Sequence, residues 1–227
     1  NATDGSMAVY SILVGQNVIA PSRFTTDGEF IAVGVEIADV YVIVKRTING
    51  AANYMLEKFN TSLTLDSAKS GGAAASVNMN QLQGETVSII RDGVIEPTQV
   101  VPASPYTITF ATAATTSYQV GLDYTVTART MPAEPVLSSG SVQGFKKRII
   151  QVDAIINDTQ DMTINGKQVS FRNFGEDVLD TAVQPFTGTK TAHGLLGYTG
   201  TGQITISQSV PLAMTVLGLE YRLSVGN

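Results

Sequence analysis

The chain contains 227 residues, 43% of them hydrophobic and 15% charged, and its formal net charge is −5 at pH 7. This length is enough for one large or two ordinary domains with packed cores, and the hydrophobic content excludes a disordered chain. The lack of cysteine excludes disulfide frameworks, thiol nucleophiles, zinc ribbons and iron–sulfur clusters, and a single histidine, His193, excludes metal sites built from several imidazoles.

The acidic balance argues against tight wrapping of nucleic acid, because tight binders cluster Lys and Arg on one face. No apolar run reaches the ~20 residues of a membrane-spanning helix. The run Val40–Val44, for example, stops at Lys45-Arg46. We therefore expect no stable membrane insertion. The sequence begins with Asn1 and has no signal peptide, so we expect a portion of a longer protein.

The first predicted elements are a turn at Asp27-Gly28 and a hairpin that closes at Asn49-Gly50, because both dipeptides tolerate the positive φ of tight turns. The first arm of this hairpin, Asp39–Ile48, is apolar on both faces until Lys45, which predicts a central position in a sheet. The segment Asn53–Phe59 is too short for an independent helix and fits equally well as the returning strand.

A stretch of small residues follows at Ser67–Ser76 and predicts a loop or linker, since it offers no large side chain for packing. Beyond it, apolar residues alternate with Thr or Ser in the windows Val87–Ile90, Tyr106–Phe110 and Tyr124–Ala128. This alternation predicts strands, and Asp92-Gly93 predicts a turn between two of them.

A second loop or linker is predicted at Met131–Pro135, because prolines cannot donate hydrogen bonds to a sheet ladder. The small residues Ser138–Ser141 follow it. After it, a strand is predicted from Lys146 to Ile155, and a turn at Asn165-Gly166. Further strands are predicted at Gln203–Ser207 and Met214–Leu219.

These elements predict an all-β fold of antiparallel, hairpin-rich sheets that form two small sandwich or barrel modules. The predicted divisions are a β-sheet segment over 1–60 that ends an upstream or platform domain, a small β-module over 61–135, and a C-terminal β-module over 136–227.

Several of these landmarks, in this order, resemble the tail tubular, or nozzle, proteins of short-tailed bacteriophages. The similar segments are Val44–Gly50 followed by Tyr54–Glu57, Leu82–Val87, Val120–Tyr124, Lys146–Ile149, Phe186–Gly188 and Pro211–Leu217. The resemblance spans most of the chain from about Ser22 onward. Family members are several times longer, with further β-domains upstream, so it implies a C-terminal portion.

The resemblance implies a structural virion protein and no enzyme. It implies a ring, expected to be sixfold, made of copies of the chain. Such a ring caps the tail tube, contacts a tail adaptor and fibre or spike proteins, and lets double-stranded genomic DNA pass transiently to the host. The expected location is the phage tail of the virion, after assembly in the host cytoplasm.

The residues themselves predict no catalytic, cofactor-binding or metal site. His193 lies in a glycine-flanked setting that indicates an exposed loop without evident catalytic partners. The glycines of Gly194–Gly202 lack the lysine of a phosphate-binding loop and precede a strand. The carboxylates of Asn157–Asp161 and Glu176–Asp180 lack calcium-loop spacing, so turn capping is the favoured interpretation.

The basic run Lys146-Lys147-Arg148 is predicted to lie at the start of a strand, either solvated or paired with a neighbouring subunit. Three charges without interleaved aromatic residues are a weak nucleic-acid patch. The acidic balance of the chain instead suits a conduit, because like charges keep DNA phosphates off its wall.

Two other functions remain open. One is a glycan- or receptor-binding β-sandwich module of a fibre or adhesin, in which Tyr41, Tyr118, Tyr198 and Tyr221 would stack on sugars. The other is a virion-associated hydrolase that acts through Glu or Asp, which would need two carboxylates about 5–9.5 Å apart in a cleft.

Overall fold

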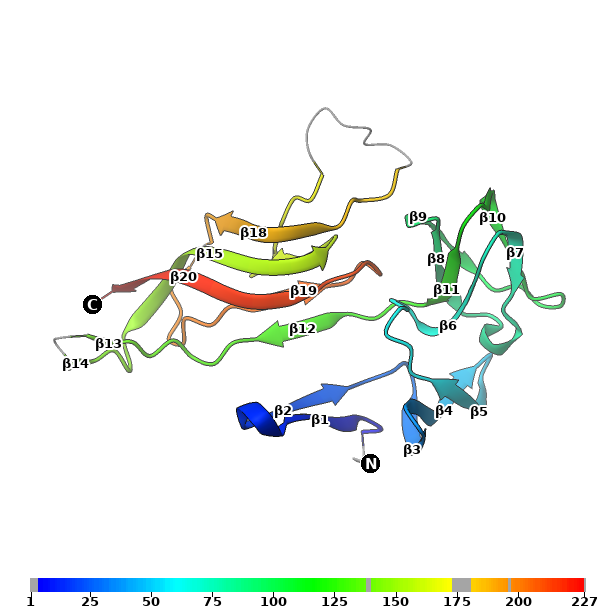
Figure 1. The fold of residues 1–227 in the computed structure, drawn as a ribbon, viewed down its shortest axis with the longest axis horizontal. Coiled ribbons are helices and arrows are strands. Elements are labelled where there is room, and N and C mark those ends of the chain that lie inside the picture. Colours follow the sequence, from blue (N-terminus) through cyan, green and yellow to red (C-terminus); the bar gives the residue numbers. More distant parts are fainter. Residues whose placement is uncertain (1–3, 138–139, 173–180, 196, 227) are drawn as a thin grey trace. The chain divides into compact units, whose positions relative to one another are not determined.

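The computed structural model describes residues 4–137, 140–172, 181–195 and 197–226, and its regular structure is nearly all strand (Figure 1). Within these residues the only helical elements are two short 3-10 turns, η1 (Val14–Gln16) and η2 (Asn80–Leu82). Every strand pairing that the structure describes is antiparallel. The predicted all-β, antiparallel fold class is therefore confirmed.

The chain folds as two compact units, which we call the N-terminal unit, up to Tyr124, and the C-terminal unit, from Thr125 onward. The residues 1–60, predicted as a separate segment, share the N-terminal unit with the residues up to Tyr124. The proline-containing segment Met131–Pro135 carries no strand, as its composition predicts, but it lies inside the C-terminal unit.

From residue 4 onward, the N-terminal unit contains eleven strands in four sheets, β1-β2, β3-β4-β5, β6-β11-β8-β9 and β7-β10. Its core consists of apolar side chains from β7, β8, β10, β11 and the η2 region, with Met79, Leu82 and Ile89 fully buried. The strands are β1 (Met7–Leu13), β2 (Val18–Phe24), β3 (Glu29–Glu36), β4 (Asp39–Ile48), β5 (Ala51–Lys58), β6 (Asp66–Gly71), β7 (Ala74–Asn78), β8 (Thr86–Arg91), β9 (Val94–Val100), β10 (Thr107–Ala114) and β11 (Tyr118–Leu122).

The C-terminal unit is organised around the 14-residue strand β15, which pairs with β18 on one side and β20 on the other. A second sheet, β12-β19-β16-β17, and the short pair β13-β14 complete it. Its core includes the fully buried Val152, Met162 and Ile164. The strands are β12 (Val126–Arg129), β13 (Val136–Leu137), β14 (Gly140–Ser141), β15 (Lys146–Thr159), β16 (Thr163–Ile164), β17 (Lys167–Gln168), β18 (Phe186–His193), β19 (Thr205–Gln208) and β20 (Val216–Gly226).

Three of the four predicted dipeptide turns close hairpins. In Asn49-Gly50, Asp92-Gly93 and Asn165-Gly166 both residues have positive φ, the conformation that matches the twist of paired strands. The prediction at Asp27-Gly28 was wrong, because β2 and β3 on either side do not pair with each other. Glycine is needed there for a different reason: a Cβ on Gly28 would lie 2.4 Å from the carbonyl oxygen of Lys45.

The predicted central strand is confirmed, since β4 lies between β3 and β5. The segment Asn53–Phe59 returns as β5 and not as a helix. By contrast, the linker predicted at Ser67–Ser76 was wrong, because β6 and most of β7 occupy it. Small residues there permit close packing, and a Cβ on Gly71 would lie 2.7 Å from the ring of Tyr118. A lack of large side chains therefore indicated close approach between strands, not flexibility.

Candidate interaction surface

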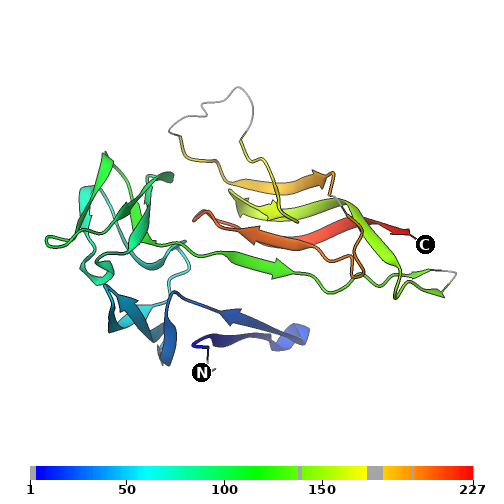
Figure 2. The ribbon, with the colours of Figure 1, turned by 180° about the vertical axis from the view of Figure 1, so that it is seen from behind.

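The hairpin formed by β1 and β2 is uncovered on both faces. All seven residues of β2 are exposed, and seven large apolar side chains of the hairpin expose between 39% and 86% of their surface. Figure 2 shows the two strands, in dark blue, paired only with each other among the described strands. The exposed apolar residues are Tyr10, Ile12, Leu13, Val14, Val18, Ile19 and Phe24.

Only the base of this hairpin is anchored. Met7 packs against the small cluster that includes Phe30, and the ring of Phe24 lies 5.7 Å from that of Phe59. Arg23 forms an exposed ion pair with Asp4 at 2.6 Å. Because an isolated two-stranded hairpin is marginal in water, the distal part of β1 and β2 is expected to gain stability from a covering surface outside its own unit.

The sheet β3-β4-β5 carries a second uncovered apolar area. Alternate residues of β4, such as Val42 and Val44, are buried, whereas Ile43 between them is 39% exposed. Leu56 pairs with Ile43 in the register and so shares its face, and Tyr54 lies two residues earlier on the same face of β5. Tyr54 and Leu56 expose 67% and 73% of their surface. The outer face of this sheet is therefore apolar at β5.

The turn between β3 and β4 presents Ile37, which is fully exposed and has a φ of 57°. A β-branched residue in the left-handed region is a true outlier and costs on the order of 1–3 kcal/mol. The neighbouring Asp39 is held by Lys58 at 2.7 Å. A strained apolar side chain at an exposed tip serves no purpose in the packing of this unit, and it extends the uncovered surface.

An open hollow of about 450 Å³ lies beside β5. Its lining is rich in side-chain amides, which come from the β4–β5 turn, from β5 and from the η2 region, and it includes Tyr54. The lining residues are Ile48, Asn49, Ala51, Asn53, Tyr54, Met55, Asn80, Gln81 and Gln83. Residues 53, 54 and 55 point to alternate faces of the sheet, so a hollow lined by all three reaches the edge of β5.

A buried ionic cluster fixes this sheet within the N-terminal unit. The Arg46 side chain on β4 is 1% exposed and donates to both carboxylate oxygens of Glu57, at 3.0 and 2.9 Å. It also donates to Asp66 at 3.0 Å and to the carbonyl oxygen of Asp27 at 2.6 Å. Burial alone would lower the pKa of Arg46, but the hydrogen bonds and charges of Glu57 and Asp66 raise it. These bonds therefore hold the sheet β3-β4-β5, which carries the exposed apolar face at β5, firmly within the N-terminal unit.

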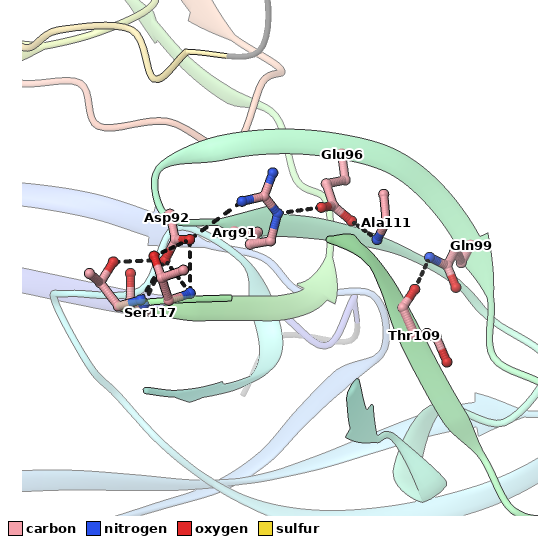
Figure 3. Close-up of polar contacts among 9 residues, drawn as sticks. Arg91, Asp92, Glu96, Gln99, Thr109, Ala111 and Ser117 are labelled. Atoms are coloured by element: carbon pink, nitrogen blue, oxygen red, sulfur yellow. Dashed lines mark hydrogen bonds and ion pairs between the residues drawn. The ribbon is translucent and has the colours of Figure 1, made fainter. Parts of the chain in front are cut away.

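Asp92 organises the other end of the N-terminal unit (Figure 3). Its carboxylate accepts hydrogen bonds from the backbone N–H groups of Thr115, Thr116 and Ser117, at 2.8–3.2 Å, and from both threonine hydroxyls. The N–H groups of Thr115 and Ser117, followed by the groups of Thr116, hold its pKa far below the usual range. This carboxylate caps the turn before β11, which is a structural role.

The neighbouring ion pair is also structural. Arg91 donates to Glu96 at 2.6 Å, and the second oxygen of this buried carboxylate accepts from the backbone N–H of Ala111 at 3.0 Å (Figure 3). The Gln99 side chain likewise donates to the carbonyl oxygen of Thr109 at 2.8 Å. These bonds tie β9 to β10, two strands of different sheets.

The predicted subunit-contact residues Lys146, Lys147 and Arg148 have three different environments. Lys147 is completely buried, and its Nζ lies 2.7 Å from a carboxylate oxygen of Glu134 in the same chain. Lys146 is exposed, and Arg148 is half-buried with an Nε that has no hydrogen-bond partner among the described residues. Only Lys146 and Arg148 are thus placed for an outside contact, which remains a prediction.

His193 is exposed, but the predicted loop was wrong, because this residue ends β18 and pairs with Gln151 of β15. The neighbouring Asp153 accepts hydrogen bonds from Thr191 at 2.5 Å and from Gln151 at 2.7 Å. The Thr191 hydroxyl, helped by Gln151 and the charges of Arg222 and His193, lowers the pKa of Asp153. The group is a surface network on a sheet face.

The carboxylates of Asn157–Asp161 are used in local bonds. Asp158 accepts from the hydroxyl of Thr187 at 3.3 Å, and Asp161 accepts from the amide of Gln168 at 2.5 Å. The run Glu176–Asp180 lies outside the described residues. Across the described part of the chain, no three metal-binding side chains of His, Asp or Glu gather, and no helix is long and apolar enough to cross a membrane.

The four tyrosines considered for sugar stacking are divided between the units. Tyr41 and Tyr118 belong to the N-terminal unit, whereas Tyr198 and Tyr221 belong to the C-terminal unit. Tyr118 packs against Phe110, with ring centroids 5.2 Å apart. The sequence reasoning missed Tyr54, the one tyrosine that lines the hollow beside β5. Its place in the predicted returning strand of the Asn49-Gly50 hairpin was the available signal.

Comparison with known proteins adds no assignment: no protein-family model matches the chain, and no curated protein matches it significantly.

Proposed function

We propose that the chain is a structural subunit that assembles with copies of itself into a ring, as in the tail nozzle of a short-tailed bacteriophage. The ring would cap the tail tube, hold adaptor and fibre or spike proteins, and let double-stranded genomic DNA pass to the host. The observation that carries the proposal is the uncovered apolar surface on β1, β2 and the outer face of β3-β4-β5. The more specific assignment to a phage tail nozzle rests on the sequence resemblance.

The size and character of the apolar surface favour assembly. Soluble monomers seldom expose contiguous apolar strands with free edges, because such strands pair with other chains. A ring requires a heterologous contact that closes under rotation, in which two different surfaces of each copy meet. The N-terminal unit offers candidate surfaces, the hairpin and the outer face at β5.

Charge supports a role as a conduit. The first 124 residues contain 11 acidic and 6 basic residues, whereas the remaining residues contain 8 of each. The net negative charge of the chain therefore belongs to the N-terminal unit. A negatively charged surface repels DNA phosphates and lets the polymer slide without being held.

The native mass of the purified chain at micromolar concentration tests the assembly. We expect a closed oligomer, with six copies as the expected number, and we expect the double variant Ile12→Asp/Ile19→Asp to be a folded monomer. Thr189→Asp, which adds a charge to the exposed polar strand β18, is the matched control and should assemble normally. A wild-type chain that stays monomeric, or a double variant that assembles like the control, would contradict the proposal.

The nozzle assignment needs a separate test in intact particles. Antibody fragments against the exposed end of β18 at His193 should label the distal tip of the phage tail in negative-stain images. Label on the capsid would overturn the assignment while leaving the assembly test intact.

The hollow beside β5 favours one second candidate function, a glycan- or receptor-binding module. Amides bind sugar hydroxyls and an aromatic ring stacks on a pyranose face, and Asn53 and Tyr54 offer both groups at the hollow. A monomeric chain that retains a saccharide, and loses it in Tyr54→Ala, would support this candidate.

A further inference from the structure

The free edge of β5 is open to a further strand. The Asn49-Gly50 turn makes Ile48 and Ala51 the hydrogen-bonded pair that flanks a two-residue hairpin. Bonding positions then alternate along β5, and Phe59 still donates to Val40 at 2.9 Å. The N–H and C=O groups of Ala52, Tyr54 and Leu56 therefore point away from β4. No described strand pairs with this edge.

The hollow lies along this edge, and its far wall carries side-chain amides. Asn80, Gln81 and Gln83 contribute to that wall from the η2 region. An amide offers one acceptor oxygen and two donor hydrogens, the same groups that a neighbouring strand offers through its backbone. The Oε1 atom of Gln81 is buried and accepts no hydrogen bond from any described residue. A strand added to the free edge of β5 would lie beside these amides.

The hairpin β1–β2 has the properties that this edge requires. β1 has 7 residues, against 8 in β5, and its outer edge is unpaired among the described strands, whereas Pro21 leaves a gap in the donors of β2. Its one basic residue, Arg23, is already paired with Asp4, so the hairpin brings no unpaired charge into an apolar contact. Ile12 pairs with Ile19 on one face, which matches the exposed Tyr54 and Leu56 in character.

We propose that the β1–β2 hairpin of one copy adds to the free edge of β5 in a second copy. The contact extends the three-stranded sheet by β-strand addition, a recognised mode in which backbone hydrogen bonds give affinity and alternate side chains give specificity. Ile12 and its neighbours on that face of the hairpin then lie beside Tyr54 and Leu56 on the extended sheet. The inference rests on the proposed self-assembly and names the two surfaces that meet.

Proline at an outward-facing position tests the backbone bonds. Ala52→Pro removes an N–H that points away from β4 and leaves the bonds between β4 and β5 in place, whereas Ala52→Val keeps the N–H. We expect Ala52→Pro to raise the dissociation constant of the assembly about tenfold or more, and Ala52→Val to leave it within about twofold. Equal assembly of the two variants would overturn the inference. Circular dichroism and urea unfolding establish that both are folded.

Cross-linking gives a second test, which does not depend on the proline variant folding. The natural chain has no cysteine, so introduced cysteines report only their own contacts. Ile12→Cys, on the face of β1 that meets Tyr54 and Leu56, is mixed in one preparation under mild oxidation with Ala52→Cys or Leu56→Cys in another. We expect disulfide-linked dimers from the mixtures and none when Thr189→Cys on β18 replaces the β5 variant.

The outcomes separate the inference from the proposed function. An assembly that forms without these cross-links, and that tolerates Ala52→Pro, overturns the hairpin contact and leaves the ring standing. A chain that remains monomeric in every preparation at micromolar concentration overturns both the hairpin contact and the proposed ring.

Discussion

Strands β8 and β2 both carry β-branched residues, but in opposite environments. Val87 and Ile89 of β8 are fully buried, whereas Val18 and Ile19 of β2 expose 44% and 66% of their surface. β8 lies between two strands and over a core, but β2 has one neighbour and no covering layer. Apolar alternation thus predicts a strand, and the neighbours decide whether it is buried. An apolar strand left uncovered by its own chain is a surface for assembly.

The largest effect is expected from the ionic cluster beneath the outer face of β3-β4-β5. Arg46→Ala should lower the free energy of unfolding by about 3–5 kcal/mol, because it leaves two partly buried carboxylates without their partner. Arg23→Ala in the hairpin, whose ion pair is exposed, should cost only about 0–1 kcal/mol. Urea unfolding measures both, and similar losses would show that the sheet does not depend on this cluster.

The comparison of β8 with β2 predicts that the same Ile→Ala substitution lowers the free energy of unfolding by different amounts in the two strands. Ile89→Ala should destabilise the chain by about 2–5 kcal/mol, because it opens a cavity in a closed core. Ile19→Ala, measured at a dilution at which the chain is monomeric, should change stability by about 0.5 kcal/mol or less. At higher concentration Ile19→Ala should instead weaken assembly. Equal destabilisation of the dilute chains would mean that the hairpin has a hidden internal partner.

Asp92 should make the N-terminal unit sensitive to acid. Its pKa is lowered in the folded state, so its stabilising contribution is complete above the unfolded value of about 4 and is lost as the pH falls through the lower folded value. Asp92→Asn should therefore melt at a lower temperature than the natural chain at pH 7. Between pH 7 and about pH 5, the difference in melting temperature between the natural chain and Asp92→Asn should stay constant. Below about pH 4 this difference should narrow. A gap independent of pH would contradict the role of the charge.

The only expected gain in stability comes from Ile37, at the turn between β3 and β4. Ile37→Gly should stabilise the isolated chain by about 0.5–1 kcal/mol, because glycine adopts a φ of 57° without steric cost. The same variant removes an exposed apolar side chain and is expected to weaken assembly. Ala38→Gly is the control for added backbone freedom and should not stabilise the chain. A destabilised Ile37→Gly chain would show that Ile37 packs within its own unit.

Much of the local architecture follows from the sequence because short-range sterics determine it. Dipeptides such as Asn49-Gly50 and Asp92-Gly93 accept positive φ, and they close hairpins wherever strands flank them. The apolar run of Asp39–Ile48 indicated a central strand, which β4 is. The small-residue stretch Ser67–Ser76 was predicted as a linker but forms strands, since small residues are typical both of flexible loops and of strands in close contact.

The surface could not be predicted in the same way, because exposure depends on contacts between distant segments. The sequence alone determined an all-β, cysteine-free chain with its main turns and several strands. Only the tertiary structure decided that Lys147 is buried on Glu134, that Tyr54 faces a hollow, and that β1 and β2 lack a cover. The physical reason is that alternation fixes which residues share a face of a strand, whereas the packing of other strands decides which face meets water.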